Sequence, residues 1–270
     1  MRVLSVNDLS CIGKCSLSVT LPIVSACGIT CDVLPTAILS THTGGFAGYT
    51  FQDLTDNLPD ILNHWEKQEE KFDILYSGYL GSEKQIDIVL DIKRRFLKED
   101  GLLIVDPVMG DSGKLYAGFS PEFPKAIARL CSAADFILPN HTEGCLLTDS
   151  TYPSDGASII EKLQTLCNTP ILTGVEENGS MAVYYLGHDG KVEQYSTPTT
   201  KGFFCGSGDV FASAFVGALA SGKDQVSAVK IATDFTSACI ARSAKEVPDH
   251  RYGLNFEKEI PYLLRLLEKN

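Results

Sequence analysis

The sequence predicts an α/β fold in which helices cover a mostly parallel central sheet with an antiparallel edge. Two observations predict it. Short apolar strand candidates alternate with helical segments along most of the chain, which is the order that builds parallel sheets. After "PILTG" this order changes, and the turn signal Asn178-Gly179 joins alternating apolar runs into an antiparallel meander.

The elements follow in order. Strands are predicted for "RVLSV" (2–6), "CDVLPTAIL" (31–39), "FDILYSG" (72–78), "GLLIVDP" (101–107), "DFILPN" (135–140), "PILTG" (170–174), "MAVYYLG" (181–187) and "KVEQYST" (191–197). Helices are predicted for 17–26, which Gly28 ends, and for 53–70, 82–99, 122–131, 155–167, 209–220, 224–243 and 256–268. Since no linker, repeat or low-complexity tract interrupts this pattern, we expect a single domain over 1–270.

Composition limits the partners. The net charge of −11 argues against a broad nucleic-acid interface, although a small phosphorylated ligand remains compatible with it. The N-terminus begins directly with a strand, and no apolar run approaches 18 residues. We therefore expect a soluble, cytoplasmic protein with no membrane partner.

The nine cysteines are an odd number in a long chain without an export signal, which indicates free thiols. Cys11, Cys15, Cys27 and Cys31 form two C-x₃-C pairs whose spacing is compatible with zinc. However, Cys27 is expected at a helix end and Cys31 inside a strand, so buried thiols are the favoured interpretation.

Ligands of parallel sheets bind beyond the carboxyl ends of the strands. The polar residues in those positions define the candidate site: Asn7-Asp8, Thr41-His42-Thr43, Tyr79, Asp106, Asn140 and Thr173.

Two glycine-rich stretches compete as phosphate loops. "GALASGKD" (217–224) has a P-loop frame, but it follows a helix and Asp224 replaces the Ser/Thr ligand, so Gly222 is interpreted as a helix end. "GSGD" instead precedes a helix, where the N–H groups of Gly206, Ser207 and Gly208 suit an anion. Asp209 is then either an N-cap or a catalytic carboxylate, and the motif alone leaves both readings open.

Acidic residues favour catalysis. "VDPVMGD" places Asp106 and Asp111 after one strand, and "LPNHTEG" places Asn140 and Glu143 after the next, near a helix start. Scattered oxygen ligands suit Mg²⁺, although Asp111 could be a turn residue and Glu143 a capping-box acid. Combined with an anion nest, they indicate phosphoryl transfer from a magnesium nucleotide. A serine or zinc hydrolase is disfavoured, since neither G-x-S-x-G nor H-E-x-x-H occurs.

The set "DPVMGD", "PNHTEG" and "GSGD", in this order, resembles the ribokinase-like superfamily. "LSTHTGGF" and "YSGYLGS" resemble the loops of its vitamin B6 branch, the pyridoxal/pyridoxamine kinases. The resemblance extends from about Leu4 to the helix after Asp209. It implies a three-layer α/β/α fold and ATP-dependent phosphorylation of the 5′-hydroxymethyl group of a B6 vitamer.

The resemblance also implies residue roles. Asp209 matches the catalytic base and residues 206–208 the anion hole. Thr43 and Tyr79 match contacts to the pyridine ring, and His42 lies in the same loop as Thr43, with a structural role nearly as well supported as substrate positioning. Asp8 replaces a serine found in many pyridoxal kinases, which leaves the preferred vitamer open.

On the nucleotide side, Asp106, Asn140, Glu143 and Thr173 match ATP positions, with Asp111 beside the phosphates. Asp106 and Glu143 are the expected Mg²⁺ residues, and the adenine is expected between segment 195–204 and helix 224–243. A homodimer, and a monovalent cation such as K⁺, follow from the family alone. The alternatives are a hydroxymethylpyrimidine kinase on the same fold, a sugar kinase, or a nucleotide-sensing module without catalysis.

Cys205 directly precedes the expected anion hole. A helix N-terminus lowers cysteine pKa values, so a reactive thiolate that adds to the aldehyde of pyridoxal is one hypothesis. The favoured alternative is a small residue packed under the loop.

Overall fold

The computed structural model describes residues 1–246 and 249–268, and five of the six strands of its central sheet were predicted. Six strands run in the order β3-β2-β1-β4-β5-β8. Their bounds are β1 Arg2–Ser10, β2 Thr30–Leu39, β3 Phe51–Asp53, β4 Phe72–Ser77, β5 Leu97–Val105 and β8 Phe136–Ile137. Every neighbouring pair is parallel except β2 with β3. The prediction of a mostly parallel sheet is confirmed.

The antiparallel edge is also confirmed. Strands β9 (Leu172–Glu177), β10 (Ser180–Leu186) and β11 (Val192–Pro198) form a meander in which β10 pairs with both others. Two parallel bridges, Ile137 to Pro170 and Asn140 to Thr173, connect this meander to the strand-end region of the main sheet.

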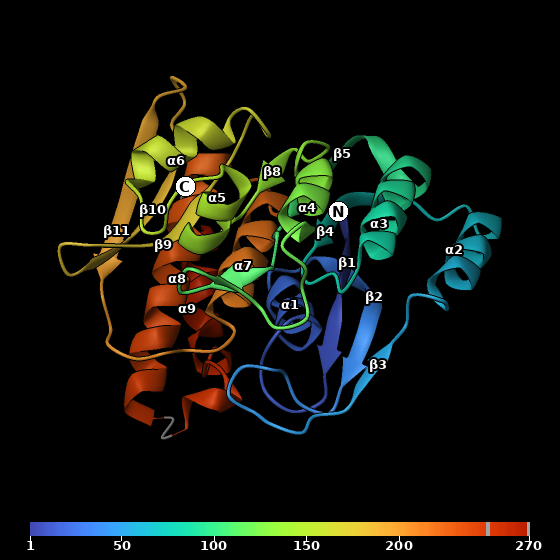
Figure 1. Cartoon of the computed structure of the whole chain (residues 1–270), viewed down its shortest axis with the longest axis horizontal. Helices are drawn as coiled ribbons and strands as arrows, with labels where there is room; N and C mark the ends of the chain where they lie inside the picture. Colours follow the sequence, from blue (N-terminus) through green and yellow to red (C-terminus); the bar gives the residue numbers. More distant parts are fainter. Residues whose placement is uncertain (247–248, 269–270) are drawn as a thin grey trace.

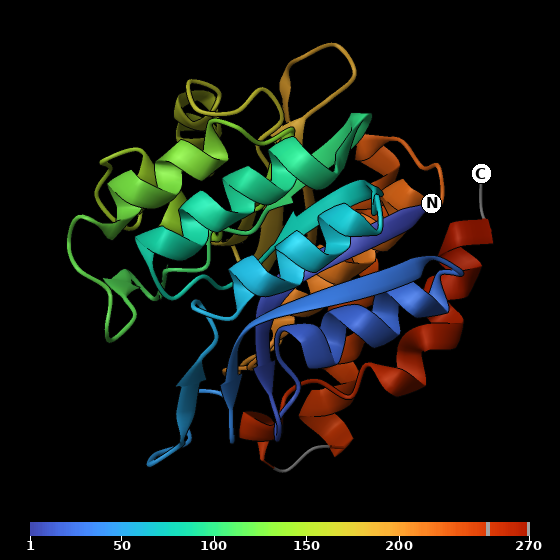
Figure 2. The same ribbon diagram turned by 90° about the vertical axis from the view of Figure 1, so that its right-hand side faces the viewer.

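Helices cover both faces of the sheet, as Figures 1 and 2 show. One face carries α1 (Leu17–Ala26), α7 (Ser207–Ala220), α8 (Gln225–Glu246) and α9 (Ile260–Glu268). The other carries α2 (Leu58–Lys67), α3 (Glu83–Phe96), α4 (Phe123–Cys131), α5 (His141–Leu147) and α6 (Gly156–Leu163). Alternate strand residues divide between the layers, since Val3 packs on the first face and Leu4 on the second. The three layers that the family resemblance implied are present.

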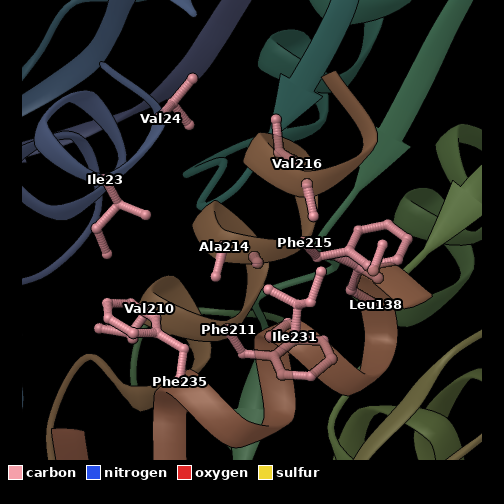
Figure 3. Packing of buried hydrophobic residues seen from close by; sticks show 14 of the residues in the cluster. Ile23, Val24, Leu138, Val210, Phe211, Ala214, Phe215, Val216, Ile231 and Phe235 are labelled. Atoms are coloured by element: carbon pink, nitrogen blue, oxygen red, sulfur yellow. The ribbon is translucent and has the colours of Figure 1, made fainter. Parts of the chain in front are cut away.

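Helix α7 lies at the centre of the first layer. Its residues from Val210 to Ala218 are all buried. Figure 3 shows Phe211 and Phe215 of this helix among Leu138, Ile231 and Phe235. A helix that is apolar on all sides must be enclosed by other elements. This packing holds the N-terminal turn of α7 in a fixed position.

Several predicted boundaries were wrong. The helix expected over 53–70 begins only at Leu58, because the Asp53 carboxylate accepts the N–H of Thr55 and turns the chain after the short strand β3. The helix expected over 82–99 ends at Phe96, and the charged residues that follow belong to β5. Helix α6 ends at Leu163, and α9 starts at Ile260 after a 3₁₀ turn, η2 (Glu257–Glu259).

The small hairpin of β6 (Gly110–Asp111) and β7 (Lys114–Leu115) was not predicted. Nor was the 3₁₀ turn η1 (His250–Tyr252). Both consist of two or three residues, too few for a periodic apolar pattern.

"GALASGKD" is a helix end, as interpreted from the sequence. Gly222 has φ 86°. Its N–H donates to Leu219, and the N–H of Lys223 donates to Ala218, which is the hydrogen-bond pattern of a Schellman motif. Cys27 likewise caps α1 and Cys31 lies in β2, as expected, and all nine cysteines are free.

Candidate active site

The N-terminus of α7 forms a backbone nest. Gly206 is its N-cap and has φ 76°. A Cβ at Gly206 would lie 2.2 Å from the carbonyl oxygen of Lys14, so only glycine fits this position. A Cβ on Gly208 would meet nothing within 4 Å, so space is open beside the first turn. The N–H groups of this turn can therefore receive an anion.

Asp209 lies in this first turn and is not the N-cap, so the simple capping interpretation is wrong. The backbone N–H of Ser16 donates to its carboxylate. The residue keeps part of its surface open, but enclosure of the carboxylate raises its pKa to about 7, and the charge of Asp8 adds to this. A carboxylate with this pKa can accept a proton near neutral pH.

Asp8 is the second carboxylate of the site and lies near the end of β1. It is buried, and its carboxylate accepts hydrogen bonds from the hydroxyls of Ser10 and Ser16. Burial outweighs these bonds and raises its pKa. Asp8 and Asp209 are therefore two neighbouring carboxylates of the candidate site.

Asp106 and Glu143 form the second acidic pair, after β5 and in α5. Both are buried, and burial together with their mutual repulsion raises the pKa of Asp106 well above its ordinary value. The pKa of Glu143 is raised to about 7, mainly by burial. Buried carboxylates with raised pKa values are what a divalent cation would neutralise, so the pair fits Mg²⁺.

The Glu143 carboxylate already has backbone partners. It accepts the N–H groups of Met109 at 2.9 Å and Asn140 at 2.9 Å, the second as half of a capping box. Three or more such ligands do not converge on one point among the described residues. A cation here would therefore keep several positions for water and phosphate, which is usual for Mg²⁺.

The other residues expected to contact the nucleotide lie near this pair. The Asn140 side chain accepts from Glu143 N–H at 3.0 Å and donates to the Gly110 carbonyl at 2.9 Å. Thr173 pairs with Asn140 through the parallel bridge, and Asp111 lies in the β6–β7 hairpin. The Asn140 amide is thus occupied in holding the hairpin and α5 together.

Of the residues expected to contact the acceptor, Tyr79 follows β4 and is half-buried. Its N–H donates to Asn7 Oδ1 at 2.8 Å, and burial followed by the charge of Asp8 raises the pKa of its hydroxyl to about 12. Thr43 is exposed in the loop after β2. His42 is buried, and both of its ring nitrogens have backbone partners. The structure therefore favours a structural role for His42 over polar contact with a substrate.

Cys205 is buried, and its thiol donates to the carbonyl of Gly44 at 3.3 Å. Burial raises the pKa of this thiol, with the charges of Asp111 and Asp249 adding to it. The expectation of a lowered pKa was wrong, because enclosure of the thiol outweighs the helix N-terminus. This favours the packing interpretation.

Sequence reasoning missed Cys15 as a site residue and considered it only in a zinc pattern. Its thiol lies beside the nest, since a Cβ on Gly206 would come within 3.5 Å of its sulfur. Burial, followed by Asp209, the thiol of Cys205 and Asp8, raises the pKa of this thiol. Asn7 was named only as a polar strand end, yet its Oδ1 accepts the N–H groups of both Asp8 and Tyr79. No short motif contains either residue, so only the three-dimensional contacts identify them.

Within the described residues, no helix has the length and apolar character needed to cross a membrane.

Comparisons with known proteins identify relatives of this chain. A Bacteroides thetaiotaomicron protein assigned as a phosphomethylpyrimidine kinase, also crystallised with pyridoxal, is 36% identical, with a TM-score of 0.92 over 97% of this chain and 93% of that one. Pyridoxal kinase from Lactobacillus plantarum is 32% identical, with a TM-score of 0.91 over 99% of this chain and 98% of that one.

Among curated sequences, a Schizosaccharomyces pombe protein assigned as a pyridoxal kinase is 28% identical over 199 residues. The match covers 67% of this chain and 56% of the relative, so it spans little more than half of that protein. The resemblance to vitamin B6 kinases is confirmed by these relatives. The profile of the phosphomethylpyrimidine kinase family matches residues 61–252, well over half of the sequence. The chain belongs to the phosphomethylpyrimidine kinase family.

Proposed function

We propose that this protein transfers the γ-phosphate of ATP to the 5′-hydroxymethyl group of pyridoxal, pyridoxamine or pyridoxine. One observation carries the proposal: Asp209, whose pKa is raised to about 7, lies in the same helical turn as the open nest of residues 206–208. A base and an anion hole in this arrangement can serve a hydroxyl acceptor and a phosphoryl group at once.

In this mechanism Asp209 accepts a hydrogen bond from the acceptor hydroxyl and takes its proton late in the transfer. The N–H groups of Gly206, Ser207 and Gly208 stabilise the phosphoryl oxygens. Asp106 and Glu143 would hold Mg²⁺, which would neutralise part of the charge of the phosphates. Asp111, Asn140 and Thr173 line the phosphate and nucleotide side.

The acceptor is a flat heteroaromatic alcohol. Tyr79 lies just after β4, Thr43 lies in the loop after β2, and Asp8 lies near the end of β1. The Bacteroides relative crystallised with pyridoxal supports a B6 vitamer as the acceptor. Hydroxymethylpyrimidine is the second candidate for the acceptor, because the family whose profile matches this chain is named for phosphomethylpyrimidine kinase.

Three further proposals rest on the family resemblance. We propose that the protein acts in the cytoplasm, that it works as a homodimer, and that a monovalent cation such as K⁺ assists nucleotide binding. Size measurement in solution and turnover with and without K⁺ would test the last two.

The test of the function is ATP consumption in the presence of Mg²⁺, with pyridoxal, pyridoxamine, pyridoxine and hydroxymethylpyrimidine compared side by side. Asp209→Asn is the control for contaminating kinases. Turnover of the B6 vitamers supports the proposal, and turnover of the pyrimidine alone would keep the mechanism but replace the acceptor. No turnover with any of the four would contradict both and favour a module that senses nucleotides.

A further inference from the structure

The ring of His42 bridges two backbone groups from distant parts of the chain. Its Nε2 lies 2.5 Å from the carbonyl oxygen of Arg251, and the N–H of Gly44 lies 3.0 Å from its Nδ1. A carbonyl only accepts and a backbone N–H only donates, so Nε2 carries the proton and Nδ1 is bare. Only the neutral Nε2–H tautomer makes both bonds.

The next link runs from Gly44 to the anion hole. The Gly44 carbonyl accepts a hydrogen bond from the thiol of Cys205, and Cys205 directly precedes Gly206. A Cβ on Gly44 would lie 2.9 Å from this sulfur. The loop after β2 that holds Thr43 and Gly44, here called the acceptor loop, is therefore packed tightly on the thiol. The position of the Gly44 peptide is therefore coupled to the residue that begins the nest.

The η1 turn closes the arrangement from the other side. Tyr252, beside Arg251, accepts the N–H of Lys14, and the carbonyl of Lys14 faces Gly206 so closely that a Cβ there would approach within 2.2 Å. One turn near the C-terminus thus contacts both the acceptor loop and the loop that supports the nest. His42 makes the first of these contacts together with the Arg251 guanidinium, which donates to the Gly45 carbonyl at 3.4 Å.

We propose that His42 is a positioning residue: by fixing the Gly44 peptide between Arg251 and Cys205, it sets the acceptor loop relative to the anion hole. The kinetic part of this inference rests on the proposed function. His42 acts through Thr43 and Gly44 and does not contact the acceptor with its ring nitrogens. The competing explanation is that His42 only stabilises the fold.

Two conservative variants separate the two bonds. Asparagine places its side-chain oxygen near the position of Nδ1, so His42→Asn retains an acceptor for Gly44 and loses the bond to Arg251. Glutamine places its amide nitrogen near the position of Nε2, so His42→Gln retains the donor to Arg251 and loses the bond to Gly44. Both remove the imidazole, so a purely structural role predicts similar effects.

The first readout is the KM for pyridoxine, which has no aldehyde to react with thiols, against the KM for ATP. We expect His42→Gln to raise the pyridoxine KM about tenfold, the effect of one lost hydrogen bond, and to leave the ATP KM within about twofold. His42→Asn should leave the pyridoxine KM within about threefold of wild type. His141→Gln is the matched control, since His141 is similarly buried and bonds the Ser154 carbonyl, away from the acceptor loop.

The second readout needs no activity. Alkylation of Cys205 by iodoacetamide, followed on its peptide by mass spectrometry, should be about five- to tenfold faster in His42→Gln and unchanged in His42→Asn. Equal alkylation rates or equal KM values in the two variants would overturn the proposal. A wild type without turnover on any acceptor would instead reject the proposed function, and the alkylation rates would still decide the role of His42.

The last link has its own variants in case His42→Gln does not fold. Cys205→Ser keeps a donor to the Gly44 carbonyl, and Cys205→Ala removes it. A pyridoxine KM that rises in the alanine variant and not in the serine variant supports the coupling. The same KM in both would refute it.

Discussion

The raised pKa of Asp209 predicts the pH at which turnover falls. Only the ionised carboxylate can accept the proton of the acceptor hydroxyl. Enclosure is the main cause that raises its pKa to about 7. The charge of Asp8 adds to this rise, and the hydrogen bond from the Ser16 N–H opposes it. With a pKa near 7, about nine tenths of the enzyme is active at pH 8 and about one tenth at pH 6. Turnover should therefore be level above pH 8 and fall about tenfold for each pH unit below 7.

The assay is kcat for pyridoxine at saturating ATP and Mg²⁺ from pH 5.5 to 8.5. Asp209→Asn should lower kcat by roughly 10²–10⁴ and abolish the fall of kcat at low pH, which is the acid limb of the profile. Asp8→Asn should move the limb to lower pH, because it removes a negative charge that raises the pKa of Asp209.

A limb that moved with the Mg²⁺ concentration would belong to Asp106 and Glu143 instead. A wild-type kcat that stayed constant from pH 8 to pH 5.5, or an Asp209→Asn variant with near-normal turnover, would refute the assignment of Asp209 as the base.

Three further predictions follow from the same geometry. The pKa values of Glu143 and Asp209 are raised to about 7 in the folded state, so their stabilising contribution is full below about pH 4 and is lost as pH rises through about 7. The raised pKa of Asp106 acts in the same direction. These groups should therefore lower the melting temperature of the metal-free protein by several degrees between pH 5.5 and pH 8. Mg²⁺ should restore more of this stability at pH 8 than at pH 5.5; equal shifts would exclude the pair as its site. Gly206→Ala should reduce kcat at least about 10²-fold, since a Cβ would clash with the Lys14 carbonyl. The control is Gly222→Ala, which should retain kcat, because Gly222 also has a positive φ, 86°, but no atom within 4 Å of the added Cβ. Similar losses in both variants would contradict the anion-hole role. Asp8→Ser should reduce kcat/KM for pyridoxamine relative to pyridoxine by roughly tenfold, because one ionic contact to the aminomethyl group is lost; an unchanged ratio would remove Asp8 from vitamer selection.

The fold could be predicted from the sequence because its layers follow from apolar periodicity. The alternation of buried strands and helices, and the turn at Asn178-Gly179, specify a parallel sheet and its antiparallel edge without reference to distant contacts. The errors lie where long-range contacts decide. Strand β3 is only three residues long and exists because it pairs with β2, and the charged start of β5 is extended because Leu97 pairs with Phe72.

The motifs of the candidate site were predictable from the sequence, but the burial of its residues was not. "GSGD" and the strand-end carboxylates are local signals, since each motif fixes its own backbone environment. Burial is not local: the enclosure that raises the pKa of Cys205, against the expectation from its helix, comes from a loop more than 150 residues away. The partners of His42 are equally remote in sequence, so its role could be inferred only from the structure.

The position of the acidic groups in the core also explains why the site tolerates so many buried carboxylates. Strands β1 and β5 and helices α5 and α7 are held by apolar packing on the two faces of the sheet, and the carboxylates lie near the ends of these elements. Repulsion among Asp8, Asp106, Glu143 and Asp209 opposes folding in the absence of ligands, and a metal-bound nucleotide would relieve it. The same repulsion that destabilises the empty site therefore favours binding of a cation with its phosphates. Burial, with a smaller contribution from the charge of Asp8, keeps Asp209 basic enough to accept a proton near neutral pH.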